Sequence, residues 1–599
     1  MKLVDSKDIQ KVSRVLHGIG GDFAAKLIMH ILKLNKLNKL YSNIYSKDSI
    51  EFIDSLLDEL SIKIECSEED LKKIPKDGSF ITVSNHPFGG IDGIILIKLL
   101  SEYRKDYKVM ANFLLQKIEP LKDCFMGVNP FENRKISSSS GLKQAINHIQ
   151  ESNALGIFPA GEVSTYQSET NKISDKQWQP SAIKLIKNAK VPVVPIYFQG
   201  GNSIAFHLLG FIHPMLRTVK LPSELLNKKN KVIRVRIGSP ISLKEQDSFD
   251  DIKQYGRFLR AKTYLLEKSF EVKKFYNYKL RASKKAEDIV LPQEENIIIK
   301  EIKNLPEECF LFKSKNYHVY CAPASDIPKI IDELGRLREE TFRIVGEGTN
   351  RSSDNDEFDL YYNHLFIWDD EAKKIVGAYR VGKGKDILEQ YGINGFYLQT
   401  LFKIDKRFNE IMSESLELGR SFIVKEYQRK PLPLFLLWKG ILYFLIKNPD
   451  YRYLIGPVSI SGKYSKLSKG VIIKFIMANY FNYDFGQYIK PRTKFKADKD
   501  IELDINLVLQ AAKNDIKSID KFIGDIEASN ENIPVLLKKY LSLNASVVGF
   551  NIDPKFNSCL DGLIVLDLFD VPSKTIESLS KELNDIEILN RFSEKPDFK

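Results

Sequence analysis

The chain has 599 residues, of which 43% are hydrophobic and 28% are charged. These proportions are those of globular proteins, and they exclude a disordered, collagen-like or coiled-coil chain. Lys and Arg number 90 against 78 Asp and Glu, which gives a formal net charge of +12 and favours an anionic partner: a lipid surface, a nucleic acid or an acidic carrier protein.

The cysteines and the apolar runs indicate which classes of protein are excluded and in which compartment the protein is expected. The 5 cysteines are widely spaced, so we expect neither a disulfide framework nor a structural zinc site. The N-terminal ten residues have no apolar core, which argues against a signal peptide. No uncharged apolar run reaches the ~18 residues that a membrane-spanning helix needs. We therefore expect a cytoplasmic protein.

Residues 1–50 predict two amphipathic helices, because apolar and basic positions alternate there with helical spacing. Glycines at 18 and 21 separate the two helices. Such a pair can lie on a membrane surface with its basic side chains outward, or it can form a helical cap on the domain that follows. The sequence leaves both interpretations open.

A first α/β domain is predicted over residues 51–285. Within it, short β-rich runs alternate with helical segments, which is typical of a sheet covered by helices. The expected strands cover 80–83, 109–111, 156–158, 191–198 and 232–237, and helices are expected at 91–100 and 141–149. Residues 271–300 are rich in charge, so we place the domain boundary near 290 and a linker at 286–300.

A second α/β domain is predicted over residues 301–599. It begins with a strand at 318–321 and a helix at 327–341, and a β-hairpin follows at 364–370 and 375–381. Further along the chain, the pattern predicts strands and one long apolar helix, at 417–424, 433–446 (the helix), 453–460, 545–550 and 563–568.

The segment FITVSNHPFGGIDGIILIKLL at 80–100 is the most informative in the chain. It places His86 at the C-terminal end of a strand, where α/β sheets bind ligands, and Asp92 in the first turn of the next helix. A carboxylate on one imidazole nitrogen fixes the tautomer and supports the imidazolium, so the other nitrogen can deprotonate a hydroxyl. Gly89 and Gly90 allow the backbone to approach a ligand closely.

Two further segments suit the same chemistry. NPFENRK at 129–135 places Arg134 on a loop, where a guanidinium can bind an anionic group. FPAGEVST at 158–165 is a strand end followed by a glycine-containing turn, whose backbone N–H groups can hold an oxyanion or a phosphate.

The blocks NHPFGGIDG, NPFENR, FPAGEVS and VPVVPIYFQG occur in the order found in the glycerolipid acyltransferase (PlsC-like) superfamily, which the chain resembles over roughly residues 60–260. The resemblance implies a PlsC-like α/β fold and transfer of an acyl group from a thioester to a lipid hydroxyl. It implies His86 as general base, Asp92 as its partner and Arg134 in binding the acceptor headgroup. The remaining substrate-binding residues that it implies are Asn85, Gly89, Gly90, Gly161 and Glu162.

Two departures from that pattern are informative. Five residues, rather than the usual four, separate His86 from Asp92, and the third block reads FPAGEVS rather than Phe-Pro-Glu-Gly-Thr. Both features resemble the aminolipid-synthesis, "hemolysin-like" branch of the superfamily.

A second candidate site lies on the predicted strand ELGRSFIV at 417–424. Glu417 and Arg420 are three residues apart, so strand alternation predicts that they lie on opposite faces. Glu417 can accept a proton from an attacking ammonium, directly or through water. Arg420 can pair with a buried carboxylate such as Asp356 or Asp359, either as part of a site or as a structural ion pair that holds the loop 343–360 on the sheet.

LREETFR, DEFDLYYNHLFIWDD, IVGAYRV and ELGRSFIV resemble the acyl-homoserine-lactone-synthase-like branch of the GNAT N-acyltransferases, and still more the N-acyltransferases of bacterial ornithine and glycine lipid synthesis, over roughly residues 300–575. The resemblance implies a GNAT-like α/β fold. It also implies that the acyl-transfer site is built by Arg338, Phe342, Asp356, Asp359, Arg380, Glu417 and Arg420. The usual pyrophosphate loop is replaced by EYQRKPLPLF, without glycine, which favours acyl carrier protein over acyl-CoA as donor.

The order of the two domains resembles the fused, bifunctional ornithine-lipid synthases (OlsF-like). It implies that the second domain N-acylates ornithine or glycine with a 3-hydroxyacyl group, and that the first domain O-acylates the new 3-hydroxyl. No bound cofactor, metal or nucleic acid is expected. The expected partners are an acyl carrier protein, an amino acid and a lipid surface, on the inner face of the cytoplasmic membrane.

Two alternatives remain at this point. One is a lysophospholipid (1-acylglycerol-phosphate) acyltransferase whose second domain is not catalytic. The other is a membrane-binding or lytic protein, as the "hemolysin" name of relatives suggests.

Overall fold

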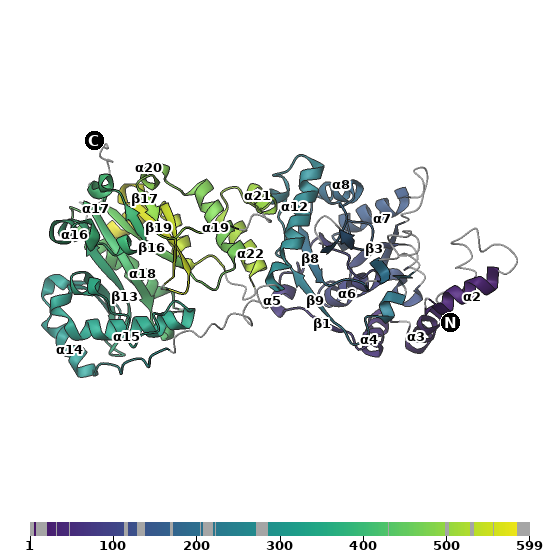
Figure 1. Ribbon diagram of the computed structural model, residues 1–599, viewed down its shortest axis with the longest axis horizontal. Helices are drawn as coiled ribbons and strands as arrows, with labels where there is room; N and C mark the ends of the chain where they lie inside the picture. The colour runs from purple at the N-terminus through teal and green to yellow at the C-terminus, as the bar shows by residue number, and fades with distance from the viewer. Residues whose placement is uncertain are drawn as a thin grey trace. The chain divides into compact units, whose positions relative to one another are not determined.

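Two β-sheets organise the protein, each in its own unit (Figure 1). The first unit comprises the described parts of residues 1–274 and 500–531, and the second comprises those of 275–499 and 532–599. The computed structural model describes residues 5–6, 21–31, 33–46, 48–112, 115, 118–128, 138–167, 172–203, 205–207, 220–221, 223–270, 286–428, 430–497, 502–527, 532–554 and 556–583.

The sheet of the first unit has the strand order β1-β9-β8-β2-β5-β3-β4. Only the β8–β9 pair is antiparallel. Parallel neighbours need crossover connections, which explains the alternation of strands and helices in the sequence. The strands are β1 (Lys63–Glu65), β2 (Phe80–Ser84), β3 (Lys108–Asn112), β4 (Phe125–Val128), β5 (Ala154–Ile157), β8 (Val193–Gln199) and β9 (Val232–Ile237), and a separate pair is formed by β6 (Thr165–Gln167) and β7 (Lys172–Ser174).

Helices cover both faces of this sheet, so the central strand β2 is buried along its whole length. Phe80 faces one core cluster, and Ile81 and Val83 face the other, as expected for side chains that alternate along a strand. Among the described residues, this unit contains the helices α2 (Gly21–Ile31), α3 (Leu34–Ile44), α4 (Ser49–Glu59), α5 (Glu68–Leu71), α6 (Gly90–Ser101), α7 (Ser138–Gln150), α8 (Pro180–Ala189), α11 (Leu243–Gln246), α12 (Ile252–Leu265), α21 (Glu502–Ala512) and α22 (Ile516–Ile526).

The sheet of the second unit has the order β10-β11-β12-β13-β15-β16-β19-β18. All neighbours in it are antiparallel except β15 and β16. Its strands are β10 (Phe310–Ser314), β11 (Tyr317–Pro323), β12 (Asn363–Asp369), β13 (Lys374–Lys383), β15 (Ser415–Ile423), β16 (Tyr453–Ile460), β18 (Ser546–Asp553) and β19 (Cys559–Asp567), and β14 (Phe402–Ile404) pairs separately with β17 (Ile489–Pro491).

Helices surround this second sheet. The long apolar segment predicted at 433–446 forms α18, which packs on β11, β12 and β13. The helices are α14 (Glu295–Asn304), α15 (Pro328–Val345), α16 (Gly384–Tyr391), α17 (Asn409–Ser413), α18 (Pro431–Lys447), α19 (Lys466–Asn479), α20 (Tyr483–Gly486), α23 (Val535–Ser542) and α24 (Ser573–Leu583).

The parallel pair β15–β16 is short. Its register joins Ser415 to Tyr453, Leu416 to Leu454 and Glu417 to Ile455. Beyond Glu417, β15 continues along β13 and β16 continues along β19. Glu417 therefore lies where the two central strands part.

The α/β class and the division into two α/β units are confirmed. The predicted N-terminal helix pair falls partly outside the described residues, which include α2 and α3 but not residues 7–20. The expected linker at 286–300 includes the beginning of α14. Across the described parts of the chain, none of the helices has both the length and the apolar composition required to cross a bilayer.

Candidate active sites

His86 and Asp92 meet at the C-terminal end of β2. His86 Nδ1 lies 2.9 Å from Asp92 Oδ2, and the same oxygen accepts the backbone N–H groups of Phe88 (3.0 Å) and Gly89 (3.1 Å). Asp92 is fully buried. Burial raises the pKa of its carboxyl above the usual value, against the opposing effects of His86 and the two N–H groups. The carboxylate thus holds Nδ1 and leaves Nε2 for a substrate.

The imidazole is fixed from its other side as well. Its ring stacks on Phe158, with 4.2 Å between ring centroids, and its side chain remains 17% exposed. Phe158 begins the predicted third block, so the structure brings the first and third blocks together. A rigid, partly exposed imidazole with a buried carboxylate partner is suited to general base catalysis.

The two glycines after His86 allow this geometry. Gly89 has φ +94°, and a Cβ there would lie 3.0 Å from Leu221 Cδ2. A Cβ on Gly90 would lie 3.3 Å from Leu115 Cδ2. These contacts explain why glycine fits in the loop, and direct binding of a substrate by either residue stays a prediction.

The other predicted residues of the first site divide into three groups. Asn85 links the end of β2 to β8 by two hydrogen bonds. Its side chain donates to Phe198 O (2.9 Å) and accepts Phe198 N–H (2.8 Å). In the third block, Gly161 has φ +69°, and Glu162 forms an ion pair with Lys176 at 3.0 Å. Arg134 lies outside the described residues. Substrate roles for Asn85, Gly161, Glu162 and Arg134 stay predictions.

Asp175 is a residue of this site that sequence reasoning missed. Its carboxylate accepts His86 N–H (3.1 Å), Ser164 Oγ–H (2.5 Å) and Trp178 Nε1–H (3.1 Å). Ser164 N–H also donates to His86 O at 2.8 Å. The buried Asp175 therefore ties the His86 loop to the third block. No motif marks an aspartate 89 positions from the histidine it holds.

Glu417 forms the centre of the second site. It is buried, it accepts Leu398 N–H at 2.8 Å, and Tyr362 donates its hydroxyl to the other carboxylate oxygen. Tyr397 N–H donates in turn to Tyr362 Oη at 3.1 Å. Burial raises the pKa of Glu417 to about 7, so its carboxylate can take up a proton near neutral pH. Tyr362 was not singled out from the sequence.

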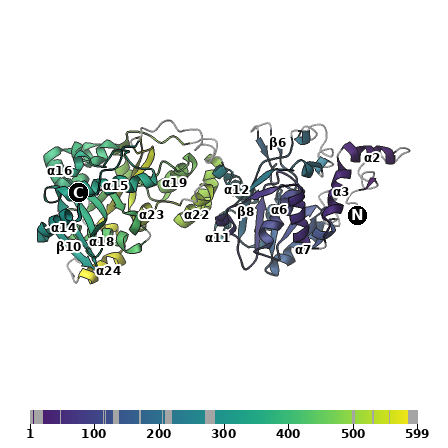
Figure 2. The same ribbon diagram turned by 90° about the horizontal axis from the view of Figure 1, so that it is seen from below.

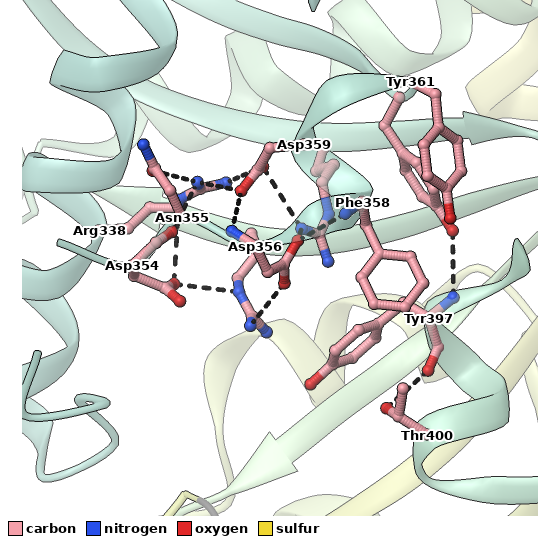
Figure 3. Close-up of polar contacts among 12 residues, drawn as sticks. Arg338, Asp354, Asn355, Asp356, Phe358, Asp359, Tyr361, Tyr397 and Thr400 are labelled. Atoms are coloured by element: carbon pink, nitrogen blue, oxygen red, sulfur yellow. Dashed lines mark hydrogen bonds and ion pairs between the residues drawn. The ribbon is translucent and has the colours of Figure 1, made fainter.

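Three arginines and three aspartates form a largely buried ion-pair network in this unit (Figure 3): Arg338, Arg380, Arg420, Asp354, Asp356 and Asp359. Arg338 binds Asp359 through both terminal nitrogens, at 2.8 and 2.9 Å. Arg380 Nη1 lies 2.5 Å from Asp356 Oδ1 and 3.3 Å from Asp359 Oδ1. The formal charges balance, which is the condition under which buried ions are tolerated.

Arg420 reaches this network because β15 is irregular. It has φ +53°, and the register with β13 shifts between Ala378 and Arg380, as at a β-bulge. Its side chain lies 3.0 Å from Asp354 and 3.3 Å from Asp356, and it covers the ring of Tyr397 at 4.9 Å. The prediction that Glu417 and Arg420 lie on opposite faces is therefore wrong: both join the Tyr362–Tyr397 cluster.

Arg420 pairs with Asp354 and Asp356, which belong to the loop 343–360. These ion pairs fit the structural role, and a role of Arg420 in the site stays a prediction. Asp359 pairs with Arg338 and Arg380 instead. Phe342 lies one turn beyond Arg338 on α15 and is half-buried. Direct contacts of these residues with a substrate stay predictions.

A second buried acid in this unit, Asp561 on β19, was also missed. It is 2% exposed and accepts Ser459 Oγ–H at 2.8 Å. Burial raises the pKa of Asp561 to about 7. Glu417 and Asp561 therefore both have a pKa near neutral pH. A pH dependence near 7 has to be assigned to one of them by substitution.

Comparisons with known families agree with both units. Residues 8–273 match the family model described as "Acyltransferase", and residues 337–438 match "Acetyltransferase (GNAT) domain". The first match includes His86 and Asp92, and the second includes Glu417 and Arg420.

Curated relatives fall into two kinds. A glycine N(alpha)-acyltransferase of Phocaeicola vulgatus is 28% identical over 273 residues, 44% of this chain and 82% of that protein. A glycine N(alpha)-acyltransferase of Bacteroides thetaiotaomicron is 29% identical, over 44% of this chain and 79% of that protein. A lyso-glycine lipid O-acyltransferase of P. vulgatus is 26% identical over 251 residues, 41% of this chain and 88% of that protein.

Among solved structures, the 1-acyl-sn-glycerophosphate acyltransferase PlsC of Thermotoga maritima matches with 16% identity and a TM-score of 0.24, over 44% of this chain and 91% of that one. The family matches and the curated relatives together establish the class of the protein. The chain is an acyltransferase enzyme with an acyltransferase-family domain in its first unit and a GNAT domain in its second.

Proposed function

We propose that this chain carries out two successive acylations in the synthesis of an aminolipid. The second unit joins a 3-hydroxyacyl group to the amine of an amino acid, and the first unit then acylates the 3-hydroxyl. The observation that carries the proposal is the presence of two separate acid–base centres in one chain, His86 with Asp92 and Glu417 with Tyr362.

The relatives support glycine as the amino acid. One kind is named for N-acylation of glycine and the other for O-acylation of a lyso-glycine lipid. Each kind accounts for less than half of this chain, so two such activities can be accommodated in it. Ornithine is the alternative amino acid that the experiment below distinguishes.

In the N-acyl step, the neutral amine attacks the thioester carbonyl of the acyl donor. Glu417 takes up the proton that the nitrogen loses, directly or through water. The thiolate departs as the amide forms and takes this proton from Glu417, so a free thiol leaves and the carboxylate is restored. A carboxyl whose pKa lies at about 7 is well matched to this transfer, because proton transfer is most efficient when the pKa of the base lies near the working pH.

In the O-acyl step, His86 Nε2 removes the proton of the 3-hydroxyl as its oxygen attacks a second thioester. Asp92 stabilises the imidazolium that forms, since its carboxylate lies 2.9 Å from Nδ1. The tetrahedral intermediate then expels the thiolate, which takes the proton back from His86. The ester and a free thiol are the products, and both protonation states are restored.

Acyl carrier protein is the donor that we propose for both steps. Two features support it: the basic excess of +12, which suits an acidic partner, and the glycine-free segment EYQRKPLPLF, which leads into α18. Because the first product is amphiphilic, we also propose that the enzyme works at the inner face of the cytoplasmic membrane.

Lipid analysis of a bacterial host that lacks aminolipids tests the proposal. Expression of the chain should produce a lipid with one amide-linked and one ester-linked acyl group, and mass spectrometry of its hydrolysate should give glycine. If the hydrolysate gave ornithine instead, the amino-acid substrate would be ornithine, and the two proposed acylations would still hold. A change confined to phosphatidic acid, or leaky membranes with unchanged lipids, would contradict the proposal.

Removing the Tyr362 hydroxyl should shift the pH dependence of amide formation. This hydroxyl donates to Glu417 and stabilises its carboxylate, so Tyr362→Phe should raise the pKa of Glu417 above about 7. A hydrogen bond to a charged group contributes roughly 1.5–3 kcal/mol. The rise of the rate of amide formation with pH should therefore move to higher pH by about one to two units. The pH–rate profile measures the shift, and full activity should return at high pH. If the midpoint of the pH–rate profile were the same in Tyr362→Phe and the wild type, Tyr362 would not stabilise the carboxylate of Glu417.

A further inference from the structure

Two helices from the second half of the sequence pack on the first unit. We call α21 and α22, residues 502–526, the helix clasp. Leu507 and Ala511 of α21 belong to the same core cluster as Ile183 of α8 and Phe258 of α12. Figure 1 shows α21 beside α12, and α22 lies near α12 in both Figures 1 and 2. The first unit therefore has a core to which residues far along the chain contribute.

Asp525, at the end of α22, anchors the clasp by polar contacts. It is 2% exposed, and its carboxylate accepts Ser239 N–H (2.8 Å) and Ser239 Oγ–H (3.0 Å). Lys73 Nζ lies 3.0 Å from the carboxylate, and Arg236 donates to Asp525 O at 3.1 Å. Lys73 and Arg236 also pair with Asp70. The clasp therefore supplies a second carboxylate to Lys73 and a backbone carbonyl to Arg236.

The clasp touches α12 in two places. Its α21 packs along α12, and Phe522 of α22 lies under the ammonium group of Lys262, 4.8 Å from ring centroid to Nζ. Lys262 is 4% exposed, so its charge is screened from water and the ring replaces part of its solvation. The position of α12 thus depends on residues from beyond the GNAT match.

Through α12, the clasp is connected to the loop that carries His86. Tyr264 of α12 accepts Asp175 N–H at 2.7 Å, and Arg260 donates to Asp175 O at 3.2 Å. The carboxylate of Asp175 in turn accepts His86 N–H at 3.1 Å. A continuous series of contacts therefore runs from the clasp through α12 and Asp175 to His86.

We infer that the helix clasp is a positioning element for the O-acyl site, supplied to the first unit by the half of the chain that carries the N-acyl site. The inference rests on the proposed O-acyl step at His86. It implies that cutting the chain in the region 271–300 does not yield an independent O-acyltransferase. It also implies that the O-acyl site is completed only after residues 502–526 have been synthesised, which follow the GNAT match at 337–438.

Two substitutions in the full-length chain test the clasp from its polar and its apolar side, Asp525→Asn and Phe522→Ala. Lys521→Ala, at an exposed position on the same helix, is the matched control. With N-(3-hydroxyacyl)glycine and an acyl carrier protein thioester supplied, ester formation by both variants should fall about tenfold to a hundredfold in kcat with little change in KM, because small misplacements of a catalytic group cost that much. Amide formation should stay within about twofold of the wild type.

Hydrogen exchange gives a readout that does not depend on the substrate. Peptides that cover residues 84–92 and 172–178 should exchange faster in both variants and at the wild-type rate in Lys521→Ala. Unchanged exchange there, or an equal loss of both activities, would overturn the inference. A wild-type chain without ester formation would contradict the proposed function, while the exchange rates would still decide the role of the clasp.

Discussion

Replacing His86 with alanine should stop ester formation while amide formation continues, so that the monoacylated amino acid accumulates. The imidazole is the group placed to remove the proton of the hydroxyl, with its Nδ1 held 2.9 Å from Asp92. General base catalysis contributes about 10²–10⁴-fold, and ester formation should fall by that factor. Mass spectrometry of lipids from cells that express the variant measures both products together.

Two further variants show whether this effect is specific. Asp92→Asn keeps the shape of the side chain but removes the charge that supports the imidazolium, so ester formation should again fall while amide formation persists. His148→Gln is the matched control, because His148 is a buried histidine of the same unit whose Nε2 contacts Ala154 O. Undiminished diacylated lipid in His86→Ala would exclude His86 as the base.

The first site was predictable because its chemistry is local in the sequence. His86 and Asp92 lie on one strand–loop–helix segment, so their contact follows from the order of the elements. Asp175 and Tyr362 lie 89 and 55 positions from the groups they hold. A single buried aspartate or tyrosine has no periodic signal, so only the tertiary structure identifies these two partners.

Regular patterns were predicted well, and irregular ones were not. The wholly buried strand β2 and the apolar helix α18 follow from runs of apolar residues. The bulge that brings Arg420 to Asp354, Asp356 and Tyr397 depends on one extra residue in the register of β15, which strand alternation does not reveal. The helix clasp is helical by its pattern, yet its amphipathic helices do not indicate which unit they cover.

Replacing Glu417 with glutamine should remove both lipid products, because the hydroxyl acceptor of the second step is no longer made. Glutamine can still accept Leu398 N–H and can still hydrogen-bond to Tyr362, so the local contacts persist without the proton acceptor. Amide formation should fall by about 10²–10⁴-fold. Ester formation should return when N-(3-hydroxyacyl)glycine is supplied to the purified variant, which separates a catalytic loss from a folding defect.

The pH dependence makes the assignment of Glu417 sharper. Its pKa is raised from 4.5 to about 7 by burial, so amide formation by the wild type should rise as pH increases through about 7. Ionisation of the buried Glu417 lowers the free energy of unfolding by about 3 kcal/mol. This loss of stability is fully present above pH 7 and absent below pH 4.5. Glu417→Gln should therefore be at least as stable as the wild type at pH 8, as measured by denaturant unfolding.

Asp561→Asn is the control that separates the two buried acids of the GNAT unit. Burial gives Asp561 a pKa of about 7 as well, but its carboxylate binds Ser459 on β16 rather than Tyr362 beside Glu417. If Glu417 is the base, Asp561→Asn should retain the rise in amide formation near pH 7. The opposite result would assign the role of base to Asp561. In that case amide formation by Asp561→Asn would no longer rise near pH 7, while Glu417→Gln would keep the pH–rate profile of the wild type.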